Sequence, residues 1–196
     1  MTPYLPWDKS WQNQIVYLPW IQPETPGMEA SPVLPAYPIF IDSLRRGPEG
    51  YEFYSAVASA MVFLLGHEPD AAINPRYCAW LREFNSEIAV QLFYEGTKMT
   101  STFNLPQAVW MLQASLLLAP ESYETNYNLA LTFSNLATKL IRDEMFHDAG
   151  RCYRQAKQYF RNADQLKRDG VTTKLKKAPD ADMTAIGYAP DSGLIN

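Results

Sequence analysis

Two short clusters of ionisable side chains are the places where this sequence could carry acid–base or metal chemistry. His67, Glu68 and Asp70 lie close together in the chain, and His147 is followed directly by Asp148. An imidazole beside a carboxylate is a common arrangement for proton transfer or metal binding. Both clusters, however, lie at expected helix ends. The helix dipole favours histidine at a C-terminal end, where His67 lies, and His147 with Asp148 fits the start of a helix. We therefore expect no catalytic residue and no metal ligand in either cluster.

The two cysteines, Cys78 and Cys152, are the remaining candidates for nucleophilic chemistry. Each lies among apolar neighbours in a helical pattern, and neither belongs to a CxxC or Cys/His motif, so we expect buried, inert thiols. The sequence also contains no glycine-rich phosphate loop, HExxH or GxSxG motif. These observations predict a protein that is not an enzyme and needs no cofactor.

The uneven distribution of proline divides the chain into segments, and these segments must position the residues named above. The chain has 196 residues and 15 prolines, and residues 1–48 hold nine of them. Proline fixes φ and removes an amide donor, so this part is expected to form an extended arm. The sequence Tyr4–Trp7 recurs at Tyr17–Trp20, and the arm is rich in aromatic residues, unlike a disordered linker. Its aromatic residues are expected to lie on the helical body or to grip a second chain.

From about residue 49 the apolar residues follow the helical period. Proline, glycine and capping residues set the expected ends: Gly66 and Pro69 stop the first helix, Asn74 caps the second, and Gly170 follows the last. Six helices are expected, covering about residues 51–65, 76–84, 86–99, 104–119, 122–143 and 146–169. No strand pair is evident, so the fold class is all-α. Residues 49–170 form the helical domain, and the polar residues 171–196 are expected to be a disordered tail.

A repeat is the strongest pattern in the helical domain. Ala108 lies twelve residues after Gly96, and Ala130 lies thirty-four after it. Leu112 and Phe133 occupy the larger apolar positions, and Ser115 with Pro120 completes the spacing. Over about residues 86–169 the chain resembles the tetratricopeptide repeat family, whose 34-residue helix pairs cross at small residues. The resemblance implies a short right-handed α-solenoid of helix pairs.

The second unit departs from the family pattern. Asn126 stands where the family favours tryptophan, and Arg142 stands where a small residue is due. The pattern returns seven residues late, as Ala149, Tyr153 and Ala156, and a register slipped by fourteen residues is also open. Seven residues are close to two helical turns, so we expect a longer helix pair. Residues 51–84 do not match and are expected to form an N-terminal cap, and a generic helical bundle is the alternative to a solenoid.

The family resemblance implies that a partner lies in the concave groove formed by the first helix of each pair. Carried over by register, the candidate partner-binding residues are Phe93, Thr97, Thr100, Ser101, Tyr127, Leu131, Ser134 and Asn135. This surface is aromatic and uncharged, and it does not provide the Lys/Asn clamp with which relatives hold a C-terminal carboxylate. An apolar or extended peptide is therefore the expected ligand, and the chain's own arm is one such peptide.

The net charge of −4 conceals a strong polarity along the chain. Between Lys139 and Lys177 there are eleven basic and five acidic residues, and the rest of the chain has six basic and sixteen acidic residues. The basic residues of the last helix follow one side, either as a solvated face or as a site for an acidic partner, including the acidic half of a second copy. We do not expect nucleic acid as a ligand, because the whole chain is acidic.

Together these patterns predict a non-enzymatic protein–protein interaction module or scaffold. The alternative is a structural or homo-oligomeric subunit whose arm docks on a neighbouring chain. The sequence has neither a run of ~20 apolar residues nor a basic and apolar start typical of a signal peptide. A cytoplasmic location without membrane contact is therefore expected.

Overall fold

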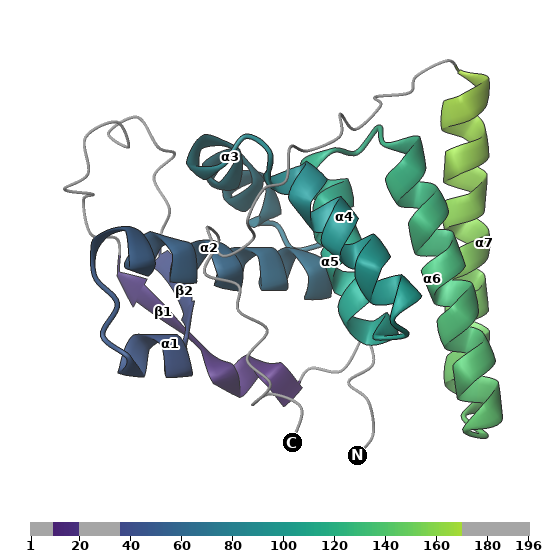
Figure 1. The fold of residues 1–196 in the computed structure, drawn as a ribbon, viewed down its shortest axis with the longest axis horizontal. Coiled ribbons are helices and arrows are strands. Elements are labelled where there is room, and N and C mark those ends of the chain that lie inside the picture. The colour runs from purple at the N-terminus through teal and green to yellow at the C-terminus, as the bar shows by residue number, and fades with distance from the viewer. Residues whose placement is uncertain (1–9, 20–35, 170–196) are drawn as a thin grey trace.

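The computed structural model describes residues 10–19 and 36–169, and these residues are mostly helical, as expected. A short 3-10 helix at Ser10–Gln14 leads into a two-stranded sheet. Its strands, β1 and β2, are followed by seven α-helices (Figure 1). The bounds are β1 Ile15–Pro19, β2 Ala36–Phe40, α1 Ile41–Arg45, α2 Gly50–His67, α3 Asn74–Phe84, α4 Ile88–Ser101, α5 Leu105–Leu118, α6 Tyr123–Arg142 and α7 Phe146–Arg168.

The strand pair corrects the expectation that the chain has no sheet. β1 and β2 are antiparallel, and Tyr17 pairs with Pro38 in the ladder. Tyr37 and Ile39 point into the body and are fully buried. The ring of Tyr37 meets Phe53 and Trp80 in edge contacts, each at 6.4 Å between centroids. The described part of the arm therefore packs on α2 and α3 of its own chain, and the three central residues of β2 are buried.

The helices from α2 to α7 begin and end within about two residues of the expected positions, since their ends carry strong local signals. Ser122 shows this clearly: its hydroxyl accepts a hydrogen bond from the amide of Thr125 at 3.1 Å, which caps α6. The expected stop at Gly170 and the tail at 171–196 lie outside the described residues.

Two local expectations were wrong. Asn74 does not cap α3 with its side chain, because it is the first helical residue. Its side-chain Nδ2 instead donates to the carbonyls of Glu68 and Pro69 at 2.7 and 2.9 Å. Gly66 does not stop α2, which continues to His67. A Cβ on Gly66 would lie 2.7 Å from the carbonyl carbon of Trp110. The glycine is therefore needed for a close crossing of α2 and α5.

The buried side chains form two clusters that share α5. The first joins α2, α3, α4 and the strand pair, and it includes Trp110, Met111 and Ala114 from α5. The second lies between α5, α6 and α7 and includes Val109 and Leu112 from the other side of α5. Both sides of α5 are therefore buried, whereas α7 packs almost entirely on α6. In Figure 1, α6 and α7 stand side by side at one edge of the molecule.

The α4–α5 and α6–α7 hairpins have the same turn. Phe103 and Glu144 adopt positive φ, at 61° and 59°, and each is the residue that follows the helix C-cap. In both turns the next amide reaches back five residues, from Asn104 to Met99 and from Met145 to Leu140. This is the Schellman arrangement, which satisfies the last carbonyls of a helix. The two turns are forty-one positions apart, from 103 to 144.

The small residues of the predicted repeat are buried among the helices. A Cβ on Gly96 would lie 2.7 Å from Cγ of Leu112, so α4 and α5 touch at this glycine. The Ser115 hydroxyl donates to the carbonyl of Ala89 at 2.8 Å, and Ala108 and Ala130 are fully buried. The predicted close contact of helices is confirmed at Gly96 and Ser115. The extended second pair is also observed, since α6 and α7 have 20 and 23 residues.

Candidate functional site

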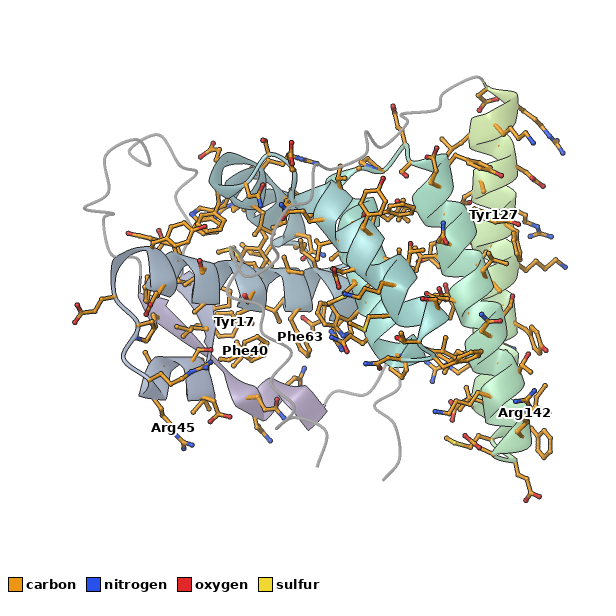
Figure 2. The ribbon with its side chains drawn as sticks, in the orientation of Figure 1. Tyr17, Phe40, Arg45, Phe63, Tyr127 and Arg142 are labelled. Atoms are coloured by element: carbon orange, nitrogen blue, oxygen red, sulfur yellow. The ribbon has the colours of Figure 1, made fainter. Side chains whose placement is uncertain are left out.

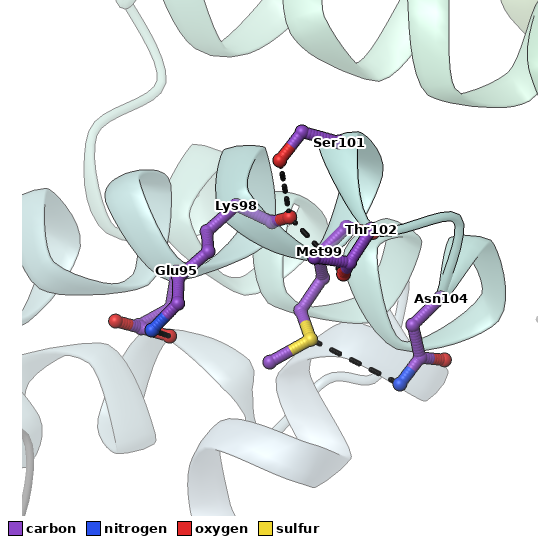
Figure 3. A network of polar contacts seen from close by, with 6 residues as sticks. All are labelled: Glu95, Lys98, Met99, Ser101, Thr102 and Asn104. Atoms are coloured by element: carbon purple, nitrogen blue, oxygen red, sulfur yellow. Dashed lines mark hydrogen bonds and ion pairs between the residues drawn. The ribbon is translucent and has the colours of Figure 1, made fainter.

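The four predicted groove residues on α4 have separate surroundings. Phe93 packs on the second buried cluster, and the Thr97 hydroxyl donates to the carbonyl of Phe93. The hydroxyl of Thr100 meets that of Thr132 on α6 at 2.8 Å. Ser101 is exposed, and its hydroxyl donates to the carbonyl of Lys98 at 2.7 Å, within the polar network at the end of α4 (Figure 3). Three of these four side chains therefore have hydrogen bonds to their own helix or to α6.

The four predicted residues on α6 are more open to solvent. Tyr127 and Leu131 are 40% and 37% exposed, Asn135 is exposed, and Ser134 is half-buried. Tyr127, labelled in Figure 2, does not face α4: its ring stacks on Tyr123 and meets the ring of Phe160 on α7 edge-on, at 5.7 Å between centroids. Tyr127 therefore belongs to a surface that α6 shares with α7.

A shallow hollow of about 510 Å³ lies between α6 and α7 next to these residues. Of the eight predicted residues, Ser134 lines it; the other lining residues are Tyr153, Ala156, Lys157, Phe160, Arg161 and Asp164 of α7. The sequence pattern predicts that the basic residues of this helix follow one side of it. The structure instead brings aromatic rings and cations together, because α7 packs on a single helix and buries only a narrow strip.

The exposed apolar side chains continue along both helices from this hollow. On α6, Tyr127, Ser134 and Ile141 are seven residues apart, and on α7 so are Phe146, Tyr153 and Phe160. Residues seven apart lie on one side of a helix. We call these six residues, with Leu131, the hairpin face. Within the described part of the chain, five of the ten exposed large hydrophobic side chains lie on it: Tyr127, Leu131, Ile141, Phe146 and Tyr153.

The hairpin face has a basic border. α7 contains six basic residues and two acidic ones, a net charge of +4. Lys157 and Arg161 line the hollow together with Asp164, and both cations are exposed. The carboxylate of the other acidic residue, Asp148, lies 4.0 Å from Arg151 at the start of the helix. The arrangement suits a ligand that combines apolar groups with negative charge.

The two histidines of the candidate acid–base clusters lie in different surroundings. The ring of His67 stacks on Phe63 at 3.9 Å between centroids, and its Nδ1–H donates to the carbonyl of Phe63 at 2.9 Å. The ring of Trp110 lies near both, with centroids 5.6 Å from Phe63 and 5.9 Å from His67. His147 is exposed at the start of α7. Among residues 10–19 and 36–169, no three His, Cys, Asp or Glu side chains are grouped as a metal site requires.

The thiols are buried, as expected. Burial, together with a smaller effect of the Asp148 carboxylate and against the opposite effect of Arg151, raises the pKa of Cys152 to about 12. Burial also raises the pKa of Cys78, and Arg82 opposes that change. Both thiols are therefore protonated at neutral pH, which is the unreactive form. None of the helices in the described ranges has the length and apolar character needed to cross a membrane.

Comparison of the chain with protein-family models, curated proteins and solved structures found no match.

Proposed function

We propose that this chain is a non-enzymatic protein–protein interaction module, built from stacked helix pairs of the tetratricopeptide type. Its partner binds on the hairpin face. The observation that carries this proposal is the gathering of exposed aromatic side chains beside cations on the last helix pair. Aromatic residues and arginine are the side chains most enriched at binding hot spots, where a few anchors supply most of the affinity.

The two matching turns support a repeat origin for the helix pairs. The positive-φ residues Phe103 and Glu144 are forty-one positions apart, which is the 34-residue family period plus seven residues. The small residue expected at position 142 likewise occurs seven residues later, as Ala149 in α7. Helix pairs repeated at this spacing would stack α6 against α4 and α5. The Thr100–Thr132 hydrogen bond joins α4 to α6.

The position of the hairpin face also favours partner binding. In a stack of helix pairs, each pair is covered by the next one. The α4–α5 pair is covered by α6, whereas α7 packs on α6 alone among the described elements with substantial contact. Apolar side chains that a further pair would bury are thus presented at the surface. We favour this face over the arm as the main contact, because Tyr37 and Ile39 of the arm are buried in their own chain.

Two variants, each with an exposed tyrosine replaced by serine, test the proposal. Tyr153→Ser removes a ring that is 47% exposed on the hairpin face, and Tyr94→Ser removes one that is 40% exposed on α4. Each is immobilised and exposed to an extract of the cells from which the sequence comes, and bound proteins are quantified against the wild type. We expect a partner that the wild type and Tyr94→Ser retain equally and that Tyr153→Ser loses by about tenfold or more, since a hot-spot truncation costs about 2 kcal/mol.

Equal recovery of every bound protein by all three chains would contradict partner binding on the hairpin face. Circular dichroism of each variant shows that a loss of binding does not come from unfolding. Both tyrosines are partly exposed, so both variants are expected to keep the helical content of the wild type.

A further inference from the structure

The side chains of the hairpin face and its basic border suit an occupant that has both apolar groups and negative charge. Its rings include Tyr127, Tyr153 and Phe160, and its cations are Lys157 and Arg161, with Asp164 as the one carboxylate in the hollow. A second copy that met this face with its own would place two sets of Lys157 and Arg161 in one interface. Because like charges facing each other oppose association, an acidic segment fits better than a symmetric dimer.

The chain itself contains such a segment. Residues 178–196 hold Asp180, Asp182 and Asp191 and no lysine or arginine. The same residues include large apolar side chains: Met183, Ile186, Tyr188, Leu194 and Ile195. The segment therefore has both the negative charge and the apolar groups that suit the hairpin face.

The connection to α7 is long enough to bring this segment back to the hollow. α7 ends at Arg168, and Lys157 lies eleven residues earlier, which is about 16 Å along the helix axis. Residues 169–177 span up to about 30 Å when extended. A short tether also gives the segment an effective concentration in the millimolar range, so a weak contact is enough to keep it bound.

We propose that residues 178–196 bind to the hairpin face of their own chain and compete there with the partner. The aspartates face Lys157 and Arg161, and the apolar side chains cover Tyr127, Tyr153 and Phe160. This inference rests on the proposed function for its biological meaning, but the contact itself is intramolecular and is measured without the partner.

The first test compares residues 1–196 with residues 1–177 by amide NMR. We expect removal of 178–196 to shift the resonances of Ser134, Tyr153 and Phe160, and to leave those of α3 unchanged. A synthetic peptide of residues 178–196, added to the shortened chain at millimolar concentration, restores the shifts. Salt at 0.5 M weakens the contact, because ion pairs at a surface are screened.

Charge reversal supplies the matched control. Lys157→Glu with Arg161→Glu in the full chain is expected to give the hairpin resonances of the shortened chain, as is Asp→Asn at positions 180, 182 and 191. Arg76→Glu with Lys98→Glu makes the same change in net charge on α3 and α4 and is expected to have no such effect. Circular dichroism confirms that each variant is folded.

Three results would overturn the proposal. In the first, the hairpin resonances do not change when 178–196 is removed. In the second, the Arg76→Glu and Lys98→Glu control pair shifts these resonances as much as the Lys157→Glu and Arg161→Glu pair does. In the third, the shifts depend on protein concentration and follow a change in mass, which assigns the face to a second copy. If the resonances are unchanged but Tyr153→Ser still loses its partner, the proposed function stands and this inference fails. If the contact of 178–196 with the hairpin face is present and every variant recovers the same proteins, this inference stands and the proposed function fails.

Discussion

Gly66 of α2 lies against the backbone of Trp110 on α5 so closely that no side chain fits between them. A Cβ at Gly66 would be 2.7 Å from both the carbonyl carbon and the Cβ of Trp110. Backbone atoms at such a contact cannot move aside without shifting a whole helix. The packing of α2 on α5 therefore depends on the absence of one methyl group.

We predict that alanine substitutions at three glycines will rank by what the new methyl meets. Gly66→Ala meets backbone and is expected to cost about 3 kcal/mol or more, whereas Gly96→Ala meets mainly the side chain of Leu112 and costs about 1–2 kcal/mol. Gly150→Ala has its nearest neighbour at 3.7 Å and is expected to stabilise α7 by up to about 1 kcal/mol. Urea unfolding of the three variants measures the order, and equal effects at all three sites would refute it.

The α6–α7 turn provides a prediction about backbone strain. Glu144 has φ of 59°, a conformation that glycine adopts without cost. Glu144→Gly is therefore expected to raise the free energy of unfolding by up to about 1 kcal/mol. Asp143→Gly, one residue earlier at φ of −85°, serves as the control and is expected to be neutral or destabilising. Thermal unfolding distinguishes the two, and a destabilised Glu144→Gly would contradict the argument.

The Cys152 thiol should make stability fall in alkaline solution. Its pKa rises from the usual 9.0 to about 12 in the folded chain. Below pH 9 both states hold the proton, so the full stability is present; above pH 9 the unfolded chain loses its proton first, and stability declines until about pH 12. At pH 10.5 this amounts to about 2 kcal/mol relative to pH 8. Urea unfolding at both values should show a smaller decline in Cys152→Ala than in the wild type, and equal declines would rule out the thiol as a cause.

Local signals made the helices predictable from sequence. Ser122 caps α6, Pro75 and Pro106 lie in the first turns of α3 and α5, and the small residue Gly96 lies at a helix crossing. Each of these signals acts through its own segment or through one neighbouring helix. The ends of α2 to α7 and the contact of α4 with α5 could therefore be predicted without the structure.

The strand pair and the hairpin face depend on contacts between segments distant in sequence. Tyr17 pairs with Pro38 across twenty-one positions of the chain, and prolines in both strands concealed the pattern. Tyr153 and Phe160 follow the apolar period of α7, but a helix that packs on one neighbour buries less than its period suggests. Ala149, Cys152, Ala156 and Ala163 fill the buried strip of α7. Which aromatic residues remained exposed could be seen only once α6 was placed beside α7.

The position of α5 between two buried clusters has a practical consequence for dissecting the molecule. A fragment ending after α5 would keep the first cluster intact, but it would expose Leu105, Val109 and Leu112 to water. That new apolar surface would favour aggregation of the fragment or adhesion to unrelated proteins. A fragment beginning at α6 would expose the complementary side chains Leu129, Phe133 and Leu136. Point substitutions on the hairpin face are therefore a safer means of mapping function than domain truncation at the α5–α6 connection.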